Sequence, residues 1–203
     1  YYNPFGVTAE AYFSEHLNAL MLRLNFTDKP GEKFHYQSGS TQLMGLIIER
    51  ATGKKLSDYL SLKLWQPMQA THAAEWSLDK KGGVEKAYCC LNSNALDFAR
   101  FGQLYLDQGN WNGQQLIDSS YVAASLHPDL SANYGYSWWL YETQHKYPVY
   151  AMRGVNGQYV MVIPALDLVA VRLGHKREKY VNNSVTDLDF YLEQLILQYD
   201  TID

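Results

Sequence analysis

The sequence has little cysteine, no long apolar run and no strong excess of either charge, and each shortage excludes a class of protein. Its two cysteines, Cys89 and Cys90, are adjacent, which excludes a disulfide framework and a C-x-x-C zinc site. Because neighbouring cysteines rarely bridge each other, each is expected to be a buried, inert thiol. No apolar run approaches the length of a membrane span. A formal net charge of −4 without a basic stripe indicates no nucleic-acid partner.

Common catalytic motifs are also missing. The sequence holds no G-x-S-x-G nucleophile elbow, no G-x-G-x-x-G dinucleotide loop and no phosphate-binding P-loop. The six histidines are scattered and form no H-E-x-x-H pair, so neither a metal site nor a cofactor is expected. The chain opens at Tyr1-Tyr2-Asn3-Pro4, without an initiator Met or a signal-peptide pattern. We interpret it as a processed, cut or partly observed chain.

What is present indicates a globular α+β fold. Apolar residues make up 47% of the 203 residues, and the chain contains 17 tyrosines. Hydrophobic periodicity and capping residues predict helices first, then an antiparallel meander, then a covering helix. The expected helices are one from a Thr8 cap to Leu24, then 40–51 ended by Gly53, 57–65 closed by Pro67, one capped by Asn94 and running towards Gly109, one from Asp118 to about Leu126, and 183–199; the expected strands are 135–142, 147–153, 158–163 and 168–173. Residues 71–92 are expected to form an irregular loop.

One serine motif is formally present. Ser77-Leu78-Asp79-Lys80 matches S-x-x-K, in which one helical turn places a lysine amine beside a serine hydroxyl. A single match of this kind is weak. Because it lies in the expected loop and Gly82-Gly83 follows it, we interpret it as a chance match.

A longer stretch resembles a known family. "PGEKFHYQSGSTQLMGLIIERATGKKLSDYL", residues 30–60, resembles the second motif region of the serine β-lactamase and penicillin-binding-protein-like superfamily. The likeness is greatest to its class C β-lactamase-related esterases and amidases. Three further segments resemble the family in the family's order: residues 64–117, "YGYSWWL" at 134–140, and "YAMRGVNGQYVMVIPALDLVAVRLG" at 150–174. The resemblance therefore runs from about Pro30 to the end of the chain.

The resemblance implies an incomplete β-lactamase-like domain. The family's S-x-x-K serine and lysine lie on a helix well before the tyrosine motif, and none of the 35 residues before Tyr36 fits them. Residue 1 is therefore expected to fall after that helix. Residues 1–203 are expected to form a single domain, with a mostly helical lobe in 1–133 and strands plus the final helix in 134–203.

The motif Tyr36-Gln37-Ser38 carries the expected proton transfer. A phenol has an ordinary pKa near ~10, so a neighbouring lysine must favour its phenolate before it can act as a base. In the family a lysine does this, and here it would lie outside the chain. The alternative is that Tyr36 only packs before a helix. Ser38 is expected to bind the lysine or the substrate amide, or to be a helix N-cap, or both. Serine in place of the family's asparagine favours an esterase or amidase over an antibiotic-hydrolysing lactamase.

The third motif departs from the family's Lys-Thr-Gly, His-x-Gly or Trp-Gly-Gly. Here the residues are Met152-Arg153-Gly154-Val155. Arg153 is aligned with the family's cation and could hold a carboxylate with two hydrogen bonds, or it could be a surface residue of an edge strand. Gly154 and Val155 are expected to lend a backbone N–H to an oxyanion hole, with an ordinary strand end as the alternative. Asn156 could contact the substrate. The nearby Trp138 and Trp139 are interpreted as core and sheet surface.

The resemblance implies a serine hydrolase that acts on a small ester, amide or peptide-like compound through an acyl-enzyme, with its nucleophile outside this chain. Residues 1–203 alone are then expected to be inactive. One alternative is a catalytically inactive relative that binds a peptidoglycan-like ligand or a partner protein. Another is an unrelated α+β domain in which the Tyr-x-Ser motif is accidental. The expected partner is a small-molecule substrate. Oligomeric state is left open, as is localisation, for which export to the bacterial periplasm is the favoured guess.

Overall fold

A computed structural model describes residues 6–25, 27–141, 146–176, 178, 180–181 and 184–200. The chain forms two compact units, one up to Ser93 and the other from Asn94 onward. Within the described residues, no helix combines the length and the apolarity that crossing a bilayer would require.

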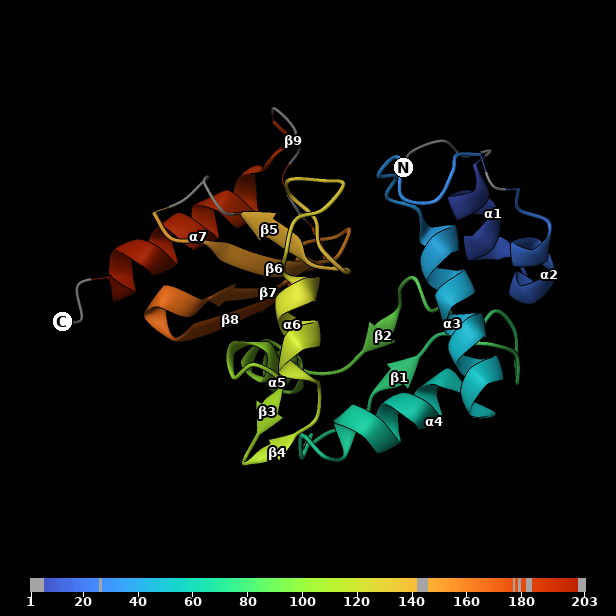
Figure 1. The fold of residues 1–203 in the computed structure, drawn as a ribbon, viewed down its shortest axis with the longest axis horizontal. Helices are drawn as coiled ribbons and strands as arrows, with labels where there is room; N and C mark the ends of the chain where they lie inside the picture. The colour runs from blue at the N-terminus through green and yellow to red at the C-terminus, as the bar shows by residue number, and fades with distance from the viewer. Residues whose placement is uncertain are drawn as a thin grey trace. The chain divides into compact units, whose positions relative to one another are not determined.

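The first unit is built around one long helix, α3. Helices α1 (Val7–Phe13), α2 (Leu17–Leu22) and α4 (Leu56–Leu60) pack against α3 (Ser38–Thr52), as Figure 1 shows. A π-helical turn η1 (Ser61–Trp65) continues α4, and a two-stranded antiparallel pair of β1 (Glu75–Trp76) and β2 (Leu91–Asn92) follows. A small apolar cluster of Ala11, Leu17, Leu20 and Met21 forms the core of α1 and α2.

The prediction of one helix from Thr8 to Leu24 is wrong. The first helix begins after Gly6, ends at Phe13, and gives way to an extended residue at Ser14. A second helix then starts at Leu17, whose backbone amide donates to the carboxylate of Asp79 at 3.1 Å. This tertiary contact holds the start of α2 and compensates for a cap that the local sequence does not supply.

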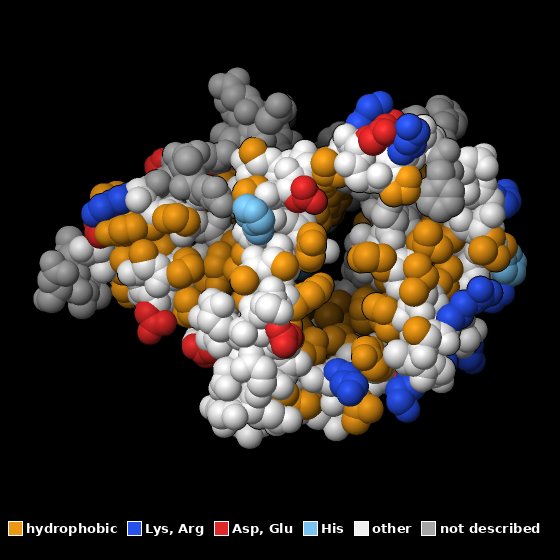
Figure 2. Space-filling view, viewed as in Figure 1, with side chains coloured by type: hydrophobic (Ala, Val, Ile, Leu, Met, Phe, Trp, Pro, Cys, Tyr) orange, Lys and Arg blue, Asp and Glu red, His pale blue; other side chains and the backbone are white. Residues whose placement is uncertain are grey.

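The end of α3 was predicted correctly, but its buried face was not. Gly53 adopts a left-handed conformation with φ +67°, and its amide bonds to Glu49 O at 2.9 Å, which ends the helix. The apolar pattern pointed to the face of Leu43, Leu46, Ile47 and Ala51. Instead, Met44 and Ile47 are more than half exposed, and hydrophobic side chains reach the surface over α3 in Figure 2. The buried residues of the helix are Ser38, Gly39, Gln42 and Gly45.

Close packing explains this orientation of α3. A Cβ placed on Gly45 would lie 2.7 Å from the Cβ of Ala87, and one on Gly39 would lie 3.1 Å from a methyl group of Leu24. The glycine face therefore lets α3 approach its neighbours more closely than the leucine and isoleucine face could. Packing density has overridden the hydrophobic pattern.

The second unit is a four-stranded antiparallel sheet between helices. Strands β5 (Trp139–Tyr141), β6 (Val149–Arg153), β7 (Gln158–Ile163) and β8 (Leu168–Leu173) lie in sequence order, as the meander prediction required. Helix α7 (Thr186–Tyr199) covers one face, and α5 (Ala95–Leu106) and α6 (Ser119–Ser125) cover the other (Figure 1). The unit also contains short pairs of β3 (Asn110–Trp111) with β4 (Gln114–Gln115) and of β9 (Tyr180–Val181) with β10 (Ser184–Val185), and a 3₁₀ turn η2 (Pro164–Leu166).

The two-residue alternation of the strands divides the core into two layers. Ala151, Tyr159 and Met161 point to α7, where they meet its buried residues Leu188, Leu192 and Ile196. Tyr150 and Val162 point the opposite way and meet Tyr105 of α5 and Val122 of α6. The sheet that carries Arg153 is thus fixed on both faces.

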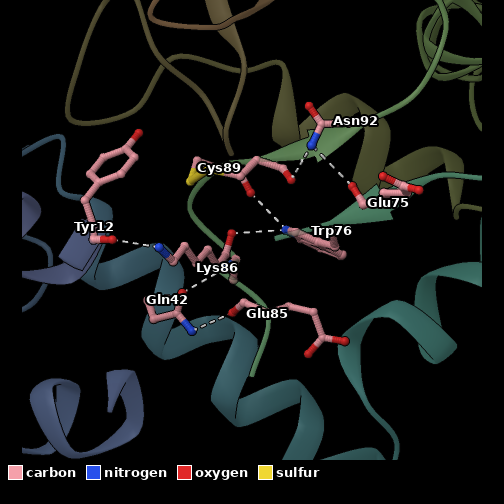
Figure 3. Close-up of a disulfide and its surroundings, with 10 residues drawn as sticks. Tyr12, Gln42, Glu75, Trp76, Glu85, Lys86, Cys89 and Asn92 are labelled. Atoms are coloured by element: carbon pink, nitrogen blue, oxygen red, sulfur yellow. Dashed lines mark hydrogen bonds between the residues drawn. A yellow bond between two sulfur atoms is a disulfide. The ribbon is translucent and has the colours of Figure 1, made fainter. Parts of the chain in front are cut away.

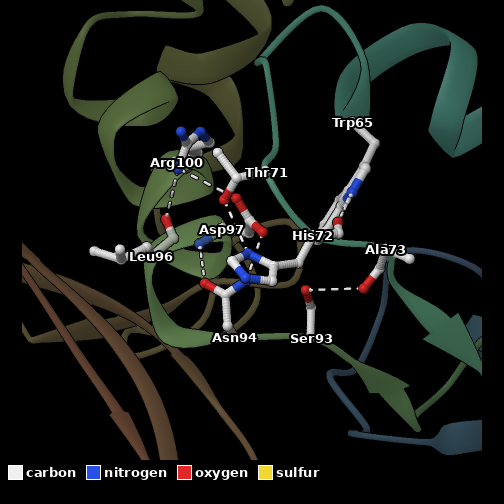
Figure 4. A network of polar contacts seen from close by, with 9 residues as sticks. All are labelled: Trp65, Thr71, His72, Ala73, Ser93, Asn94, Leu96, Asp97 and Arg100. Carbon is white, nitrogen blue, oxygen red and sulfur yellow. Dashed lines mark hydrogen bonds and ion pairs between the residues drawn. The ribbon is translucent and has the colours of Figure 1, made fainter.

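Both predicted helix caps in the second unit are confirmed. The side-chain oxygen of Asn94 accepts the amide of Asp97 at 3.0 Å at the start of α5 (Figure 4). Asp118 accepts the amide of Ser120 at 2.8 Å at the start of α6. Each cap satisfies an amide that the helix itself leaves without a partner.

Candidate active site

The expected site residues form two groups, one in each unit. Tyr36 lies two residues before α3, and its side chain is 41% exposed. Ser38 is the first residue of α3 and is only 5% exposed. The N-cap residue is Gln37, which makes no side-chain cap bond, so the alternative that Ser38 is the N-cap is wrong. The motif thus presents an accessible phenol beside a buried hydroxyl at the start of a helix.

Gln42, one turn into α3, anchors this helix to the loop that precedes β2. The side chain of Gln42 is 1% exposed. Its amide nitrogen donates to Glu85 O at 3.0 Å, and its oxygen accepts the amide of Ala87 at 2.8 Å (Figure 3). Because the side-chain nitrogen and oxygen are both hydrogen-bonded to backbone, this polar group can be buried without leaving either atom unsatisfied. The position of Ser38 and Tyr36 depends on this anchor.

A buried carboxylate in the same loop ties α3 to α4. Glu85 is 3% exposed, and one of its oxygens accepts both the amide and the hydroxyl of Ser57, at 3.1 and 2.5 Å. Burial alone would raise the pKa of Glu85, but the two bonds from Ser57, together with bonds from its own backbone and from Glu49, outweigh it and the pKa lies below its ordinary value. On α3, burial raises the pKa of Glu49 and the charge of Glu85 raises it further.

Arg153 ends strand β6 of the second unit. Its guanidinium stacks on the ring of Trp139, 4.0 Å from the ring centroid, and donates to the hydroxyl of Tyr141 at 2.9 Å. Strand β6 is an inner strand of the sheet, so the alternative that Arg153 lies on an edge strand is wrong. The stacked, hydrogen-bonded side chain has a fixed direction, as a group that recognises a planar anion requires.

The backbone amides in the turn after Arg153 differ in their hydrogen-bond partners. Gly154 donates its amide to Gln158 O at 2.7 Å, and Asn156 donates its amide to the side-chain oxygen of Gln158 at 3.1 Å. Between them, the amide of Val155 finds no acceptor within the described part of the chain, and the residue is 48% exposed. Of the three amides, that of Val155 is therefore the one whose N–H group can donate to a ligand.

Gly154 is required for this turn. A Cβ at position 154 would lie 2.4 Å from the side-chain oxygen of Gln158. The side-chain nitrogen of Gln158 in turn donates to Gly174 O at 2.6 Å, which links the turn to the end of β8. From the sequence, Gln158 could contact the substrate or, with Gly157, form the turn into the next strand; its bond to the amide of Asn156 follows only from the folded turn.

The formal S-x-x-K match does not form a catalytic pair. Ser77 and Lys80 lie in an irregular segment, as expected, and the ammonium group of Lys80 is 3.1 Å from the ring nitrogen of His16. The expectation of two free thiols is wrong, because Cys89 and Cys90 are joined in a disulfide. Among the described residues, no three His, Cys, Asp or Glu side chains are grouped to hold a metal ion.

Comparisons with known proteins identify the family of this chain. The family model described as Beta-lactamase matches residues 1–188. The chain belongs to the Beta-lactamase family. The alternative of an unrelated α+β domain is therefore wrong. The resemblance stated from the Tyr36 motif and the late strands, and the β-lactamase-like fold expected from it, are confirmed.

Named relatives of this Beta-lactamase family chain include hydrolases. The 6-aminohexanoate-dimer hydrolase of Paenarthrobacter ureafaciens is 27% identical over 157 residues, which cover 70% of this chain and 39% of that protein. A solved Bacillus anthracis protein, provisionally named a 6-aminohexanoate-dimer hydrolase, is 26% identical with a TM-score of 0.77, over 92% of this chain and 50% of the other. The chain thus spans half or less of the length of these relatives.

A more distant structure shares the fold alone. The octameric penicillin-binding protein homologue of Pyrococcus abyssi is 19% identical with a TM-score of 0.64, over 85% of this chain and 44% of the other. At this identity the likeness supports the β-lactamase-like arrangement of helices and antiparallel strands, and nothing about substrate.

Sequence reasoning missed two further residues that shape the site of this Beta-lactamase family chain. Gln42 carried a signal, since an uncharged polar residue between glycines on one helix face is unusual on an exposed, apolar-patterned helix. Trp139, which could line the cleft but was interpreted as core and sheet surface, supports the guanidinium of Arg153. Its role had no local signal, because Trp139 and Arg153 come from different strands.

The Glu49–Glu85 pair predicts a pH dependence of stability. The folded-state pKa of Glu49 is raised above 4.5, so its contribution is complete below about that pH and is lost as the pH rises through the raised value. Glu85 acts oppositely, since its lowered pKa means that its contribution is lost only as the pH falls. We therefore expect Glu49→Gln, which stays neutral, to raise the thermal unfolding temperature at pH 8 more than at pH 5.

The exposed Glu75→Gln is the matched control, since it removes one carboxylate from the same unit. Unfolding is followed by circular dichroism at both pH values. For each variant, the change in unfolding temperature relative to wild type is compared between pH 5 and pH 8. If Glu49→Gln gives the same change at both pH values, as the control Glu75→Gln is expected to do, the assignment of the pH dependence to Glu49 is wrong.

Proposed function

We propose that this chain is part of a serine hydrolase that cleaves a small amide, ester or peptide-like compound through an acyl-enzyme. The observation that carries the proposal is the Tyr36-Gln37-Ser38 motif at the start of α3, with an accessible phenol and a buried serine hydroxyl. The family membership supports it. So does the likeness, over most of the chain, to a protein provisionally named a 6-aminohexanoate-dimer hydrolase.

In the proposed reaction, Tyr36 moves protons between the nucleophilic serine, the leaving group and water. It requires a nearby cation to favour the phenolate. The cation is proposed to be the lysine of an S-x-x-K motif. Both this lysine and the nucleophilic serine are proposed to lie outside residues 1–203, since the S-x-x-K match within them lacks the helical geometry. The hydroxyl of Ser38 is proposed to orient the lysine amine or the substrate amide.

The second group supplies charge stabilisation. The spare amide of Val155 is proposed to bind the oxyanion of the tetrahedral intermediate, while the Gly154 amide maintains the turn. The fixed guanidinium of Arg153 is proposed to bind an anionic group of the substrate, and Asn156 to contact it with its side-chain amide. A linear amide that carries a carboxylate is the proposed substrate class, in keeping with the dimer of an amino acid named for the relatives.

The location of the nucleophile is tested by labelling. We expect a fluorophosphonate to label one serine outside residues 1–203 in the complete natural protein, because the proposed S-x-x-K lies there. Intact-mass and peptide analysis identify the serine. Residues 1–203 alone are expected to remain unlabelled and to hydrolyse no chromogenic ester. Hydrolysis by residues 1–203 that is abolished by Ser77→Ala would contradict the proposal. Absence of labelling in the complete protein would support the inactive, ligand-binding relative instead.

The role of Tyr36 is tested by removing one oxygen atom. We expect Tyr36→Phe in the complete protein to lower kcat roughly 10²–10⁴-fold, the usual contribution of a positioned acid or base. Steady-state hydrolysis of an ester and of a linear amide measures the effect. Tyr12→Phe is the matched control, since Tyr12 lies in the same unit and is 40% exposed. Equal activity of the two variants would assign Tyr36 a packing role.

The role of Val155 is tested through its backbone. Val155→Pro removes the amide proton, and we expect kcat to fall roughly 10²–10³-fold, as for loss of one oxyanion donor. Val155→Ala keeps the amide and is expected to retain wild-type kcat. Thermal unfolding of both variants establishes that the turn is intact. If a folded Val155→Pro protein turns over at the wild-type rate, another group binds the oxyanion.

A further inference from the structure

The disulfide between Cys89 and Cys90 lies in the first unit, in the segment that leads into β2 (Figure 3). Both residues are only half-buried, as a site open to a small thiol reagent requires. The bond joins neighbours in sequence and closes no long loop, so it contributes little to stability through chain entropy. Its structural effect is therefore on the backbone of its own two residues.

That backbone is in a costly conformation. Cys90 has φ +69°, in the left-handed region that residues with a Cβ rarely adopt. In this conformation the carbonyl of Cys90 accepts the amide of Ser77 at 3.1 Å and the side-chain amide of Asn92 at 3.1 Å. The bond from Ser77 extends the pairing of β1 with β2, which begins at the next residue, Leu91.

Trp76 reports on the same segment. Its indole N–H lies between two carbonyls, that of Cys89 at 2.9 Å and that of Lys86 at 3.1 Å (Figure 3). Trp76 belongs to β1 and pairs with Leu91 of β2. A change of the backbone at Cys89 and Cys90 therefore alters the surroundings of an indole ring directly.

We propose that Cys89–Cys90 is a redox-active modification site, which a dithiol reductant opens and thereby releases the segment from β1. One thiolate of the reductant attacks a sulfur atom and forms a mixed disulfide, and its second thiol then closes the reductant's own disulfide. Two electrons and two protons pass to the protein, so the S–S bond becomes two thiols. Without the bond, Cys90 leaves the left-handed region, and its carbonyl releases the amide of Ser77. The proposal is independent of the hydrolase function.

The chemical step is tested on the folded chain. Reduction with dithiothreitol, followed by iodoacetamide without denaturant, is expected to add two carbamidomethyl groups, both located at Cys89 and Cys90 by peptide mass analysis. The unreduced protein is expected to add none. Modification only after denaturation would overturn the proposal, as would two free thiols in protein purified and kept under air.

The structural step is tested by amide hydrogen exchange at Ser77. We expect reduction to speed its exchange roughly tenfold, as for loss of one hydrogen bond, and to change the tryptophan fluorescence in wild type but not in Trp76→Phe. Exchange at the unreduced rate in the reduced, alkylation-competent protein would overturn the proposal.

Two matched variants isolate the backbone cause. Cys89→Ser/Cys90→Ser lacks the bond and keeps a Cβ at position 90, so Ser77 is expected to exchange at the rate of the reduced protein. Cys89→Ser/Cys90→Gly also lacks the bond, but glycine accepts φ +69° without steric cost, so Ser77 is expected to stay close to the rate of the disulfide form. Equal exchange in the two variants would overturn the backbone mechanism.

Discussion

The first unit depends on one buried side chain, the amide of Gln42. It offers a donor and an acceptor to the backbone of Glu85 and Ala87, and so replaces the apolar contact that a helix face usually provides. Gly45, three residues further along α3, allows the close approach to Ala87 that these bonds need. The result is that hydrogen bonds of defined direction position α3 together with the apolar contact of Leu46 on the cluster of α1 and α2. Ser38 is the first residue of this helix and Tyr36 lies two residues before it, so both are close to that anchor in sequence.

Features set by neighbouring residues could be predicted from the sequence. The caps at Asn94 and Asp118, the left-handed stop at Gly53 and the four-stranded meander all follow from local chemistry and a two-residue period. The buried face of α3 could not be predicted, because Ile47 and Met44 carry the apolar signal while the glycine face carries the contact. Nor could the break at Ser14, since Asp79, far along the chain, holds the start of the next helix. For the site, the motif predicted Tyr36 and Ser38, whereas the support of Arg153 by Trp139 exists only in the folded sheet.

The hydrogen bonds of the turn after Arg153 reduce the candidate oxyanion donors to one amide, which the sequence motif alone does not. The sequence alone could not choose between the backbone amides of Gly154 and Val155 as the oxyanion donor. In the turn they are not equivalent, because the backbone carbonyl of Gln158 accepts the amide of Gly154 and its side chain accepts that of Asn156. A turn that closes on itself in this way keeps the strand end rigid without using the middle amide. Rigidity of a donor before the charge develops is what makes oxyanion stabilisation effective.

The earlier and later parts of the loop between β1 and β2 make different contacts in the first unit. Its earlier part, around Glu85 and Ala87, holds α3 through Gln42, and the amide of Lys86 donates to Ser77 O at 2.9 Å. Its later part contains the disulfide and bonds to β1 through Cys90 O. The bonds of Gln42 involve neither cysteine, so we expect them to persist when the sulfur–sulfur bond is broken, whereas Lys86 O accepts the amide of Cys89 at 3.0 Å. We therefore expect a redox change at Cys89 and Cys90 to act on the β1–β2 pair and to leave α3 in place.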